Sequence, residues 1–292
     1  MDNLAINSLN SLNSLNSSNN LDNFVKIQFT SDNHLEFYKD KKIDILDFIT
    51  PCAPYLAILG DLGYPTLDNF KDFLSQTSKI YDKVFYLKGN HEFYQCNIQP
   101  IMTCDEINDK IQEICKSFDN VYYMDNTEHL LTDNIIILGS TLWSNIPQHQ
   151  QSKIKQVIND YKYIFIKEKH YKTNISPKYT SDLHLYNVKW LENMLEKYKN
   201  KKVIILSHHL PTFELIAPEY KDSNSNCAFA SNLDYLMKQN SNIKFWLCGH
   251  THSNVETKIN ECECITNPFG YPNENNKYDK EKFILLKNNS FY

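Results

Sequence analysis

The sequence contains no arginine, and all 30 basic residues among its 292 positions are lysines. Arginine is the usual bidentate clamp for phosphate and carboxylate groups, so its absence excludes arginine-based recognition of an anionic ligand. The 35 acidic residues outnumber the lysines and give a formal charge of −5. Nothing global therefore attracts the chain to nucleic acid or to anionic lipid, and any anionic ligand must be held locally.

Long hydrophobic stretches are also absent. No apolar run approaches the roughly 20 residues that a membrane-crossing helix needs, and the N-terminus has neither a basic patch nor an apolar leader segment. The eight cysteines include no C-x-x-C pair, which argues against a disulfide framework and against a thiolate zinc site. We expect free thiols, including the close pair Cys262 and Cys264. These absences predict a cytoplasmic protein with no membrane partner.

Residues 1–22 differ in composition from the rest of the chain. They are rich in Asn and Ser, so they cannot bury enough apolar surface to order themselves. We predict a disordered tail there and one folded domain over residues 23–292. In that domain short apolar runs alternate with segments of helical periodicity, which is typical of an α/β or α+β fold. Lys, Gln and Tyr are frequent after residue 144, and we expect a helical insertion around 144–200.

Two segments show clear helical periodicity. Apolar residues repeat on one face from 105 to 118, after a capping box formed by Thr103 and Glu106, and a second apolar stripe runs from 181 to 198. Continuous apolar runs predict strands that are buried on both faces. The six predicted strands are 25–29, 55–59, 84–87, 135–138, 203–206 and 243–247.

Polar clusters follow the predicted strands within a few residues. Five of the six strands are followed by residue types that bind metals, and the sixth by Gly-Ser-Thr-Leu-Trp at 139–143. Because ligands of layered α/β proteins bind beyond the carboxyl ends of the strands, we expect these clusters to converge. The five clusters are Asp32-Asn33-His34, Gly60-Asp61, Gly89-Asn90-His91-Glu92, His208-His209 and Gly249-His250-Thr251-His252.

The donor types in these clusters predict a site for two divalent metal ions. Carboxylate, amide and imidazole donors suit Mn²⁺, Fe or Zn²⁺. One carboxylate must bridge the ions, and Asp61 is the candidate because the preceding glycine allows a tight backbone turn. Two ions leave a local positive excess that holds a phosphate without arginine, and they activate a hydroxide for attack on phosphorus. His91, next to a predicted ligand, is placed to protonate the leaving oxygen.

Taken in order, the motifs D-x-H, GD, GNHE, HH and GHTH resemble those of the calcineurin-like metallophosphoesterase superfamily, over residues 32–252. The resemblance implies a four-layer αββα sandwich with a dinuclear metal site at the strand ends. It implies that Asp61 bridges the ions and that His91 protonates the leaving group. It also implies the remaining ligands, which are Asp32, His34 and His252 for the first ion and Asn90, His208 and His250 for the second.

Two features depart from the family pattern. Many members read G-D-x-x-D, in which the second Asp orients the histidine of the GNH motif. Tyr64 occupies that position here, so we expect His91 to lack its carboxylate partner. The arginines by which the Ser/Thr protein phosphatases of the superfamily grip phosphate have no counterpart. The chain is more similar to a branch of small stand-alone metallophosphoesterases, although Phe269 stands where we expect Arg in that branch.

Four residues are predicted to contact the substrate, namely Asn33, Trp143, His209 and Tyr271. Two of them are aromatic and, with Phe93 and Tyr94, could line a pocket for a base or another planar leaving group. Aromatic residues this abundant are also typical of a core. His209 is assigned to the shape of the site because the first of two adjacent histidines usually binds the metal in the family.

The motifs favour a hydrolase of a phosphomonoester or phosphodiester, with a phosphorylated small molecule or nucleotide as its partner. A nuclease of the same superfamily is a second hypothesis, and the net charge and the lack of a lysine cluster beside the motifs argue against it. A third hypothesis is a non-catalytic scaffold that keeps the fold, as the retromer subunit of this fold does. Tyr64 and Phe269 favour the scaffold, whereas the complete ligand set and His91 argue against it.

Overall fold

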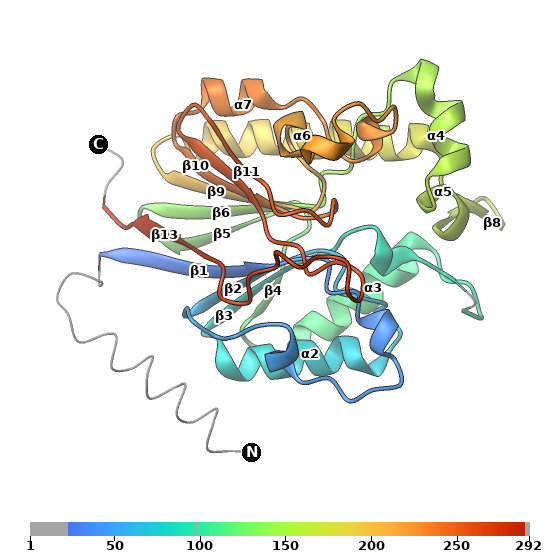
Figure 1. Ribbon diagram of the computed structural model, residues 1–292, viewed down its shortest axis with the longest axis horizontal. Coiled ribbons are helices and arrows are strands. Elements are labelled where there is room, and N and C mark those ends of the chain that lie inside the picture. The colour runs from blue at the N-terminus through green and yellow to red at the C-terminus, as the bar shows by residue number, and fades with distance from the viewer. Residues whose placement is uncertain (1–22, 97, 290–292) are drawn as a thin grey trace.

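The computed structural model describes residues 23–96 and 98–289. The tail predicted over 1–22 lies outside the described residues. Two sheets lie face to face at the centre of the molecule, and helices cover both outer faces (Figure 1). The predicted four-layer αββα sandwich is confirmed. Among the described residues, no helix is both long enough and apolar enough to cross a membrane.

The first sheet has five strands in the order β13-β1-β2-β3-β4. Strands β1 to β4 run parallel to one another, and β13 is antiparallel at one edge. The bounds are β1 Phe24–Thr30, β2 Tyr55–Leu59, β3 Lys83–Leu87, β4 Val121–Tyr123 and β13 Phe283–Lys287.

The second sheet has six strands in the order β11-β12-β10-β9-β6-β5. Its four inner strands are parallel, and the edge strands β5 and β11 are antiparallel to their neighbours. The bounds are β5 Thr127–Thr132, β6 Ile135–Ser140, β9 Lys202–Ser207, β10 Ile243–Cys248, β11 Glu256–Ile259 and β12 Cys262–Thr266. The six strands expected from the apolar runs are thus β1, β2, β3, β6, β9 and β10, and all six are confirmed.

Side chains of the parallel strands alternate between two apolar layers, because successive residues of a strand point to opposite faces. Ala57 and Leu59 of β2 pack between the sheets with residues of β9, whereas Leu56 and Ile58 pack on the outer side with α2 and α3. A third cluster joins the outer face of the second sheet to α6 and α7. These helices are α2 Asp68–Ile80, α3 Cys104–Lys116, α6 Pro177–Lys197 and α7 Asp234–Gln239.

Both predicted helices are confirmed, as α3 and as the greater part of α6. The capping box at the start of α3 is present, with Thr103 and Glu106 each accepting a backbone N–H of the other. Short 3-10 turns connect several elements. Their bounds are η1 Leu35–Tyr38, η2 Ile45–Asp47, η3 His91–Phe93, η4 Gln148–Gln150, η5 Phe213–Leu215, η6 Pro218–Tyr220 and η7 Asn226–Ala228.

The region from 144 to 200 is not a purely helical insertion. It contains α4 (Gln151–Val157) and α5 (Asp160–Tyr163), followed by a hairpin of β7 (Phe165–Glu168) and β8 (Tyr171–Asn174). The expectation of helix was wrong over 165–174, where aromatic and β-branched residues favour strands. The long helix α6 belongs to the sandwich itself, because its apolar stripe packs on the second sheet.

Candidate metal centre

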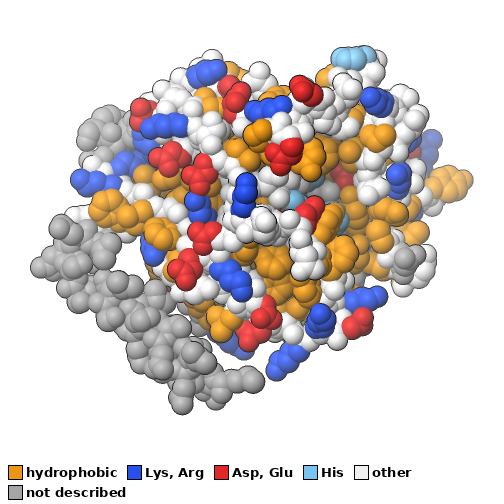
Figure 2. Space-filling view, in the orientation of Figure 1, with side chains coloured by type: hydrophobic (Ala, Val, Ile, Leu, Met, Phe, Trp, Pro, Cys, Tyr) orange, Lys and Arg blue, Asp and Glu red, His pale blue; other side chains and the backbone are white. Residues whose placement is uncertain are grey.

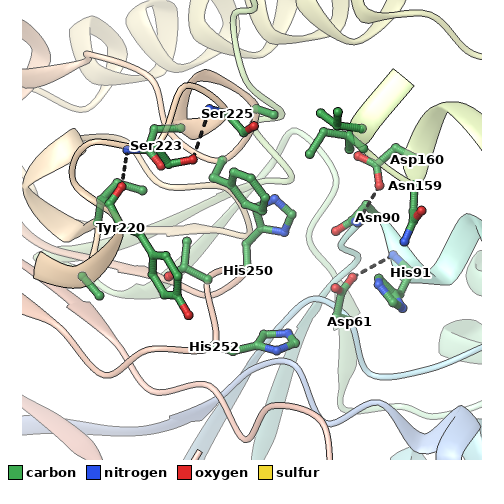
Figure 3. Close-up of a pocket in the computed structure, with 18 of the residues that line it drawn as sticks. Asp61, Asn90, His91, Asn159, Asp160, Tyr220, Ser223, Ser225, His250 and His252 are labelled. Carbon is green, nitrogen blue, oxygen red and sulfur yellow. Dashed lines mark hydrogen bonds between the residues drawn. The ribbon is translucent and has the colours of Figure 1, made fainter. Parts of the chain in front are cut away.

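The polar clusters converge beyond the carboxyl ends of β1, β2, β3, β9 and β10. Within the described ranges of the chain, three groups of three side chains bring their potential ligand atoms within 4.8 Å of one another, and two of these groups consist of predicted ligands alone. One group is Asp32, His34 and His252, and the other is Asp61, His208 and His250. Figure 3 shows Asp61, Asn90, His91, His250 and His252 around one hollow. The structure therefore brings together the seven residues predicted to bind metal, although they span more than two hundred residues of chain.

Asp61 belongs to the second group and also reaches the first. Its Oδ2 is 3.9 Å from His34 Nε2, and its Oδ1 is 3.4 Å from His208 Nε2. One carboxylate oxygen thus faces each group, which is the arrangement that a bridging ligand requires. Asn90 Oδ1 is 3.0 Å from His208 Nε2, so the amide oxygen lies beside the second group.

Three histidines of the site are oriented through their Nδ1 atoms. His34 Nδ1 is 2.9 Å from Glu36 Oε1, His208 Nδ1 is 2.8 Å from the Leu59 carbonyl, and His252 Nδ1 is 2.6 Å from Glu274 Oε2. An acceptor at Nδ1 favours the tautomer that carries the proton there and leaves the Nε2 lone pair free to bind a metal. All three Nε2 atoms face the cluster.

The donor set fits divalent cations. His34 Nε2 and His252 Nε2 face each other at 3.0 Å, and the Asp32 and Asp61 carboxylates are buried beside them. Two imidazole lone pairs at this distance repel, as do two buried carboxylates, and a proton or a metal cation between them relieves both conflicts. Imidazole, carboxylate and amide oxygen are donors that Mn²⁺, Fe and Zn²⁺ accept.

The backbone of the site is held in an uncommon conformation. Five of the predicted ligands have left-handed φ angles, which cost energy for residues other than glycine and cluster at functional sites. They are Asp32 at 54°, His34 at 48°, Asp61 at 53°, His250 at 75° and His252 at 49°. Hydrogen bonds across the loops hold this conformation, among them Asp32 N to the Gly60 carbonyl at 2.9 Å and His34 N to the Asp61 carbonyl at 3.0 Å.

The glycines of the GD and GNHE motifs allow these loops to approach closely. A Cβ on Gly60 would collide with the His208 ring and with the backbone of Gly89. A Cβ on Gly89 would collide with Asp61 Oδ1 and with the His208 ring. Only glycine fits both positions, so each motif pairs a metal-binding residue type with the space that the neighbouring ligand needs.

A cavity of about 490 Å³ opens from the predicted ligands. We call its floor the residues Asp61, Asn90, His91, His250 and His252, and its wall the cavity-lining residues within 157–160 and 216–229. In the space-filling view, histidine side chains are visible inside a hollow on this face (Figure 2). The volume is within the range of pockets that take up small molecules, and metal-binding residue types lie at the base of this one.

The fold and the site agree with a comparison to known families. The model of the family described as "Calcineurin-like phosphoesterase" matches residues 25–254. The chain belongs to the calcineurin-like phosphoesterases. It is also 34% identical over 274 residues to "Uncharacterized protein L509" of Acanthamoeba polyphaga mimivirus, covering 88% of this chain and 95% of that protein.

The solved structures that this calcineurin-like phosphoesterase resembles are small stand-alone metallophosphoesterases, not Ser/Thr protein phosphatases. One is the Phosphopantetheinyl Hydrolase (PptH) from Mycobacterium tuberculosis, with a TM-score of 0.66 and 17% sequence identity, covering 90% of this chain and 96% of that one. Members of the family hydrolyse phosphoric esters and typically bind two divalent metals. The residues that this chain brings to its floor fit that chemistry.

Charges in this phosphoesterase site are strongly coupled. Burial alone would lower the pKa of His208, but the charge and hydrogen bond of Asp61 raise it to about 10. Burial likewise opposes the charge on His252, yet its hydrogen bond to Asp32 raises the pKa to about 9. Burial would raise the pKa of Asp61, but the nearby His208 and His91 hold it well below its usual value. The carboxylates therefore draw positive charge into the site, as protons where no metal is bound.

His91 has a carboxylate partner, so the expectation that it lacks one was wrong. His91 Nδ1 is 3.1 Å from Glu36 Oε1, the same oxygen that contacts His34. Burial works against the charge on Glu36, but its hydrogen bonds to the two histidines lower its pKa to about 2. Tyr64, at the position of the absent Asp, instead packs against the core cluster beneath the first sheet. Glu36 thus takes over the orienting role of an acid at position 64.

The far side of the His91 ring faces the cavity. His91 Nε2 is 3.3 Å from the Tyr271 hydroxyl, and the ring stacks on Tyr94 with centroids 4.1 Å apart. Burial lowers the pKa of His91, but the Asp61 charge and the hydrogen bond to Glu36 outweigh it and raise the pKa. With Nδ1 directed at Glu36, Nε2 is the atom from which this residue can donate a proton into the cavity.

Glu92, the last residue of the GNHE motif, connects two loops of the site. It is fully buried and accepts hydrogen bonds from the backbone N–H groups of Asp61 at 3.2 Å, Leu62 at 2.9 Å and Gly89 at 2.8 Å. Burial and the charge of Asp61 raise its pKa to about 7. No role was predicted for Glu92, although its place in the GNHE motif was a signal.

The four residues predicted to contact the substrate are placed differently from one another. Tyr271 lines the cavity. Asn33, Trp143 and His209 are buried and do not line it. Asn33 donates to Thr30 Oγ1, and Trp143 packs on Phe93 and the His209 ring, so these three support the floor from behind. Phe269, at the expected Arg position, packs between Phe48 and Tyr278 in the core.

Two further acids at the site carry no motif signal. Glu274 contacts His252 Nδ1 and accepts the Tyr271 backbone N–H at 2.9 Å. Asp160, on α5, is 2.9 Å from Asn90 Nδ2. Both lie outside the five clusters, and only the folded chain brings them to the predicted ligands.

Proposed function

We propose that this protein hydrolyses a phosphomonoester or phosphodiester of a small molecule or nucleotide with the help of two divalent ions. The observation that carries the proposal is the meeting of two largely buried donor groups at Asp61, on the floor of a cavity of about 490 Å³. When bound, such ions activate water and neutralise phosphate charge. Asp61 would contact both ions. The first would be held by Asp32, His34 and His252, and the second by Asn90, His208 and His250.

His91 is the proposed acid of the reaction. Hydrolysis replaces the ester oxygen on phosphorus by the oxygen of water, and the departing oxygen needs a proton. His91 lines the cavity, its Nδ1 is held by Glu36, and its pKa is raised, which keeps a proton available at Nε2. The hydroxyl of Tyr271 lies 3.3 Å from that nitrogen and supports its orientation toward the substrate.

The charge of the cavity supports a small substrate rather than a nucleic acid. Among the described residues that line it, none is a lysine, and the chain has no arginine. A strand of nucleic acid requires cationic side chains along its backbone. Lysines on this face are instead interspersed with acidic side chains (Figure 2). These charges favour an ester whose phosphate is bound at the ions and whose organic part occupies the cavity.

We propose that the protein acts in the cytoplasm. All eight cysteines are free thiols in the structure, five of them buried. Free thiols persist in reducing compartments, whereas exported proteins generally use cysteines in disulfides.

The test is hydrolysis of para-nitrophenyl phosphate and bis-para-nitrophenyl phosphate by metal-stripped protein titrated with Mn²⁺, with bound metal measured in parallel. Turnover that saturates as about two ions bind per chain supports the enzyme and identifies the ester class. A phosphopantetheinyl ester, the group named for the similar mycobacterial protein, belongs in the following substrate panel. Two bound ions without turnover of any ester would favour the scaffold hypothesis, and a chain that binds no metal would overturn the proposal.

A further inference from the structure

The side-chain amide of Asn90 can bind a metal in only one of its two orientations. Its oxygen is a ligand, whereas its NH₂ group only donates hydrogen bonds and repels a cation. The two ends have nearly the same size and shape, so packing alone does not choose between them. A neighbour that accepts hydrogen bonds and cannot donate them does choose.

Asp160 is such a neighbour. Its Oδ1 accepts a hydrogen bond from Asn90 Nδ2 at 2.9 Å, as Figure 3 shows, and a second from the Tyr94 hydroxyl at 2.7 Å. An oxygen that accepts two hydrogen bonds carries no proton, so the NH₂ end of Asn90 must face it. Asn90 Oδ1 then points the other way and lies 3.0 Å from His208 Nε2.

The pair is buried, which makes the contact effective. Asp160 is 4% exposed and Asn90 is 3% exposed. Water therefore has little access to the amide, and turning it would place its oxygen against the Asp160 oxygen, leaving two acceptors without a donor between them. Asp160 belongs to none of the groups whose ligand atoms converge in the described part of the chain, so it acts on a ligand rather than as one.

We propose that Asp160 is a positioning residue that holds the Asn90 oxygen toward the second metal ion. The inference rests on the proposed function, since it presupposes the two-ion site. If so, the segment that contains α4 and α5 has a role that the sequence did not show. It brings the carboxylate of Asp160 to Asn90, a predicted ligand 70 residues earlier in the chain. The wall of the cavity thereby takes part in assembling the floor.

A structural alternative exists for the same residue. Asp160 is the first residue of α5, where an acidic side chain stabilises a helix by itself. Simple removal of the carboxylate therefore does not separate the two roles. They separate in a variant whose residue 90 needs no orientation, because both oxygens of a carboxylate are ligands.

The experiment is a double-mutant cycle of Asp160→Ala and Asn90→Asp, read by calorimetric titration of the metal-stripped proteins with Mn²⁺. With Asn90 present, Asp160→Ala is expected to weaken the second Mn²⁺ by about 10- to 100-fold and to leave the first unchanged. In the Asn90→Asp background a carboxylate oxygen faces Asp160 whichever way residue 90 turns, so the same substitution removes a repulsion and is expected to leave that affinity unchanged or to raise it. Asn159→Ala, at the exposed neighbour that lines the same cavity, is the matched control and is expected to bind as the wild type does.

Two further variants serve as controls for the side chain at position 160. Asp160→Asn keeps the size of the side chain but can donate hydrogen bonds as well as accept them, so it is expected to retain only part of the affinity for the second Mn²⁺. If Asp160→Ala does not fold, as judged by circular dichroism of the metal-free protein, the cycle is run with Asp160→Ser, whose shorter side chain withdraws the acceptor from Asn90.

The outcomes distinguish the inference from the proposed function. Equal losses in both backgrounds, or no loss with Asn90 present, would overturn the positioning role while two ions in the wild type still support the enzyme. A wild type that binds no Mn²⁺ would overturn both. The role of Asp160 is supported if the affinity for the second Mn²⁺ falls with Asp160→Ala only when residue 90 is Asn, and if the affinity for the first Mn²⁺ does not change.

Discussion

The floor and the wall of the cavity are built differently. Floor residues lie directly after buried strands, in loops held by cross-loop hydrogen bonds, by glycines that allow close approach, and by Glu36 and Glu92. Wall residues lie on short helices and 3-10 turns, and several of them, including Val157, Asn159 and Tyr220, are exposed. Many contacts with neighbouring residues therefore fix the conformation of the floor, whereas several residues of the wall are exposed to solvent.

This difference suggests that the floor carries out the reaction and that the wall selects the substrate. Groups that hold ions and transfer protons need fixed geometry, which a rigid scaffold of strand ends provides. Groups that contact the organic part of a substrate tolerate variation, and loops over a scaffold supply it. Substitutions in the floor are therefore expected to act on metal content and turnover, and those in the wall on the apparent affinity for particular esters.

The largest effect is expected from Asp61→Asn. An amide offers one oxygen where the carboxylate offers two, and it removes the negative charge that offsets two cations. We expect fewer than two Mn²⁺ per chain by metal analysis and the greatest loss of turnover of any variant here. The exposed Asp72→Asn on α2 is the matched control and should keep both. A full complement of two ions in Asp61→Asn would contradict the bridging role.

The next largest effect is expected from His91→Ala, which should separate proton transfer from metal binding. Removing a general acid typically costs about 10²- to 10⁴-fold in turnover. We expect this loss in kcat, with two Mn²⁺ still bound, since no predicted ligand is changed. His170→Ala, at an exposed histidine in the β7–β8 turn, is the control. Unchanged turnover would remove the acid role from His91.

Glu36→Gln tests whether a residue behind the floor acts through His34 and His91. The substitution keeps the shape but replaces an ionised acceptor that serves both His34 and His91. Losses of about 10- to 100-fold are expected for residues that orient ligands or acids, here in turnover and in Mn²⁺ affinity together. The exposed Glu113→Gln on α3 should change neither. An effect on turnover with normal Mn²⁺ affinity would limit the role of Glu36 to His91.

Metal binding to the floor is expected to strengthen as the pH rises. Without metal, the raised pKa values of His252, about 9, and His208, about 10, mean that both hold a proton near neutral pH. An ion that takes their Nε2 atoms must displace these protons, so a lower pH opposes binding. Below the lower pKa the affinity should rise by up to about tenfold per pH unit for each proton released.

Calorimetry in two buffers of different ionisation enthalpy counts the released protons directly. Binding without proton release, or with an affinity independent of pH, would contradict the raised pKa values of His208 and His252.

The contrast between floor and wall also sets what the sequence could predict. The meeting of the seven candidate ligands was predicted because each follows an apolar run that is recognisable as a buried strand. Strands β5 and β13 lie at sheet edges and were not predicted. No residue of β5 is buried, and β13 alternates exposed with buried residues. Low apolar content hides β5 from a search for apolar runs, whereas β13, with the sequence Phe-Ile-Leu-Leu-Lys, is as apolar as the strands that were predicted.

The acidic residues that contact His91 and Asn90 could not be predicted for a different reason. Glu36 lies 55 residues before His91, and Asp160 lies 70 residues after Asn90. No local pattern relates these positions, and only the packing of η1 and α5 against the strand ends brings them together. The error at Tyr64 has the same origin, since a missing acid at one position says nothing of an acid that another loop supplies.

The smallest effect is expected in the wall, from Tyr220→Ala. Tyr220 lines the cavity from η6 and is 58% exposed, so its removal should leave the fold and the floor intact. A ring that packs on an aromatic leaving group is worth about a 2- to 10-fold change in affinity. We therefore expect KM for para-nitrophenyl esters to rise by that factor, with kcat and Mn²⁺ content unchanged.

The control is Tyr171→Ala on β8, a more exposed tyrosine that does not line the cavity. It should leave KM unchanged. If Tyr220→Ala instead lowered kcat or the bound metal, the wall at that point would be part of the catalytic framework, and the division between a rigid floor and a selective wall would not hold on that side of the cavity. If it changed nothing, the leaving group would have to lie toward α5, where Asp160 joins the wall to the floor.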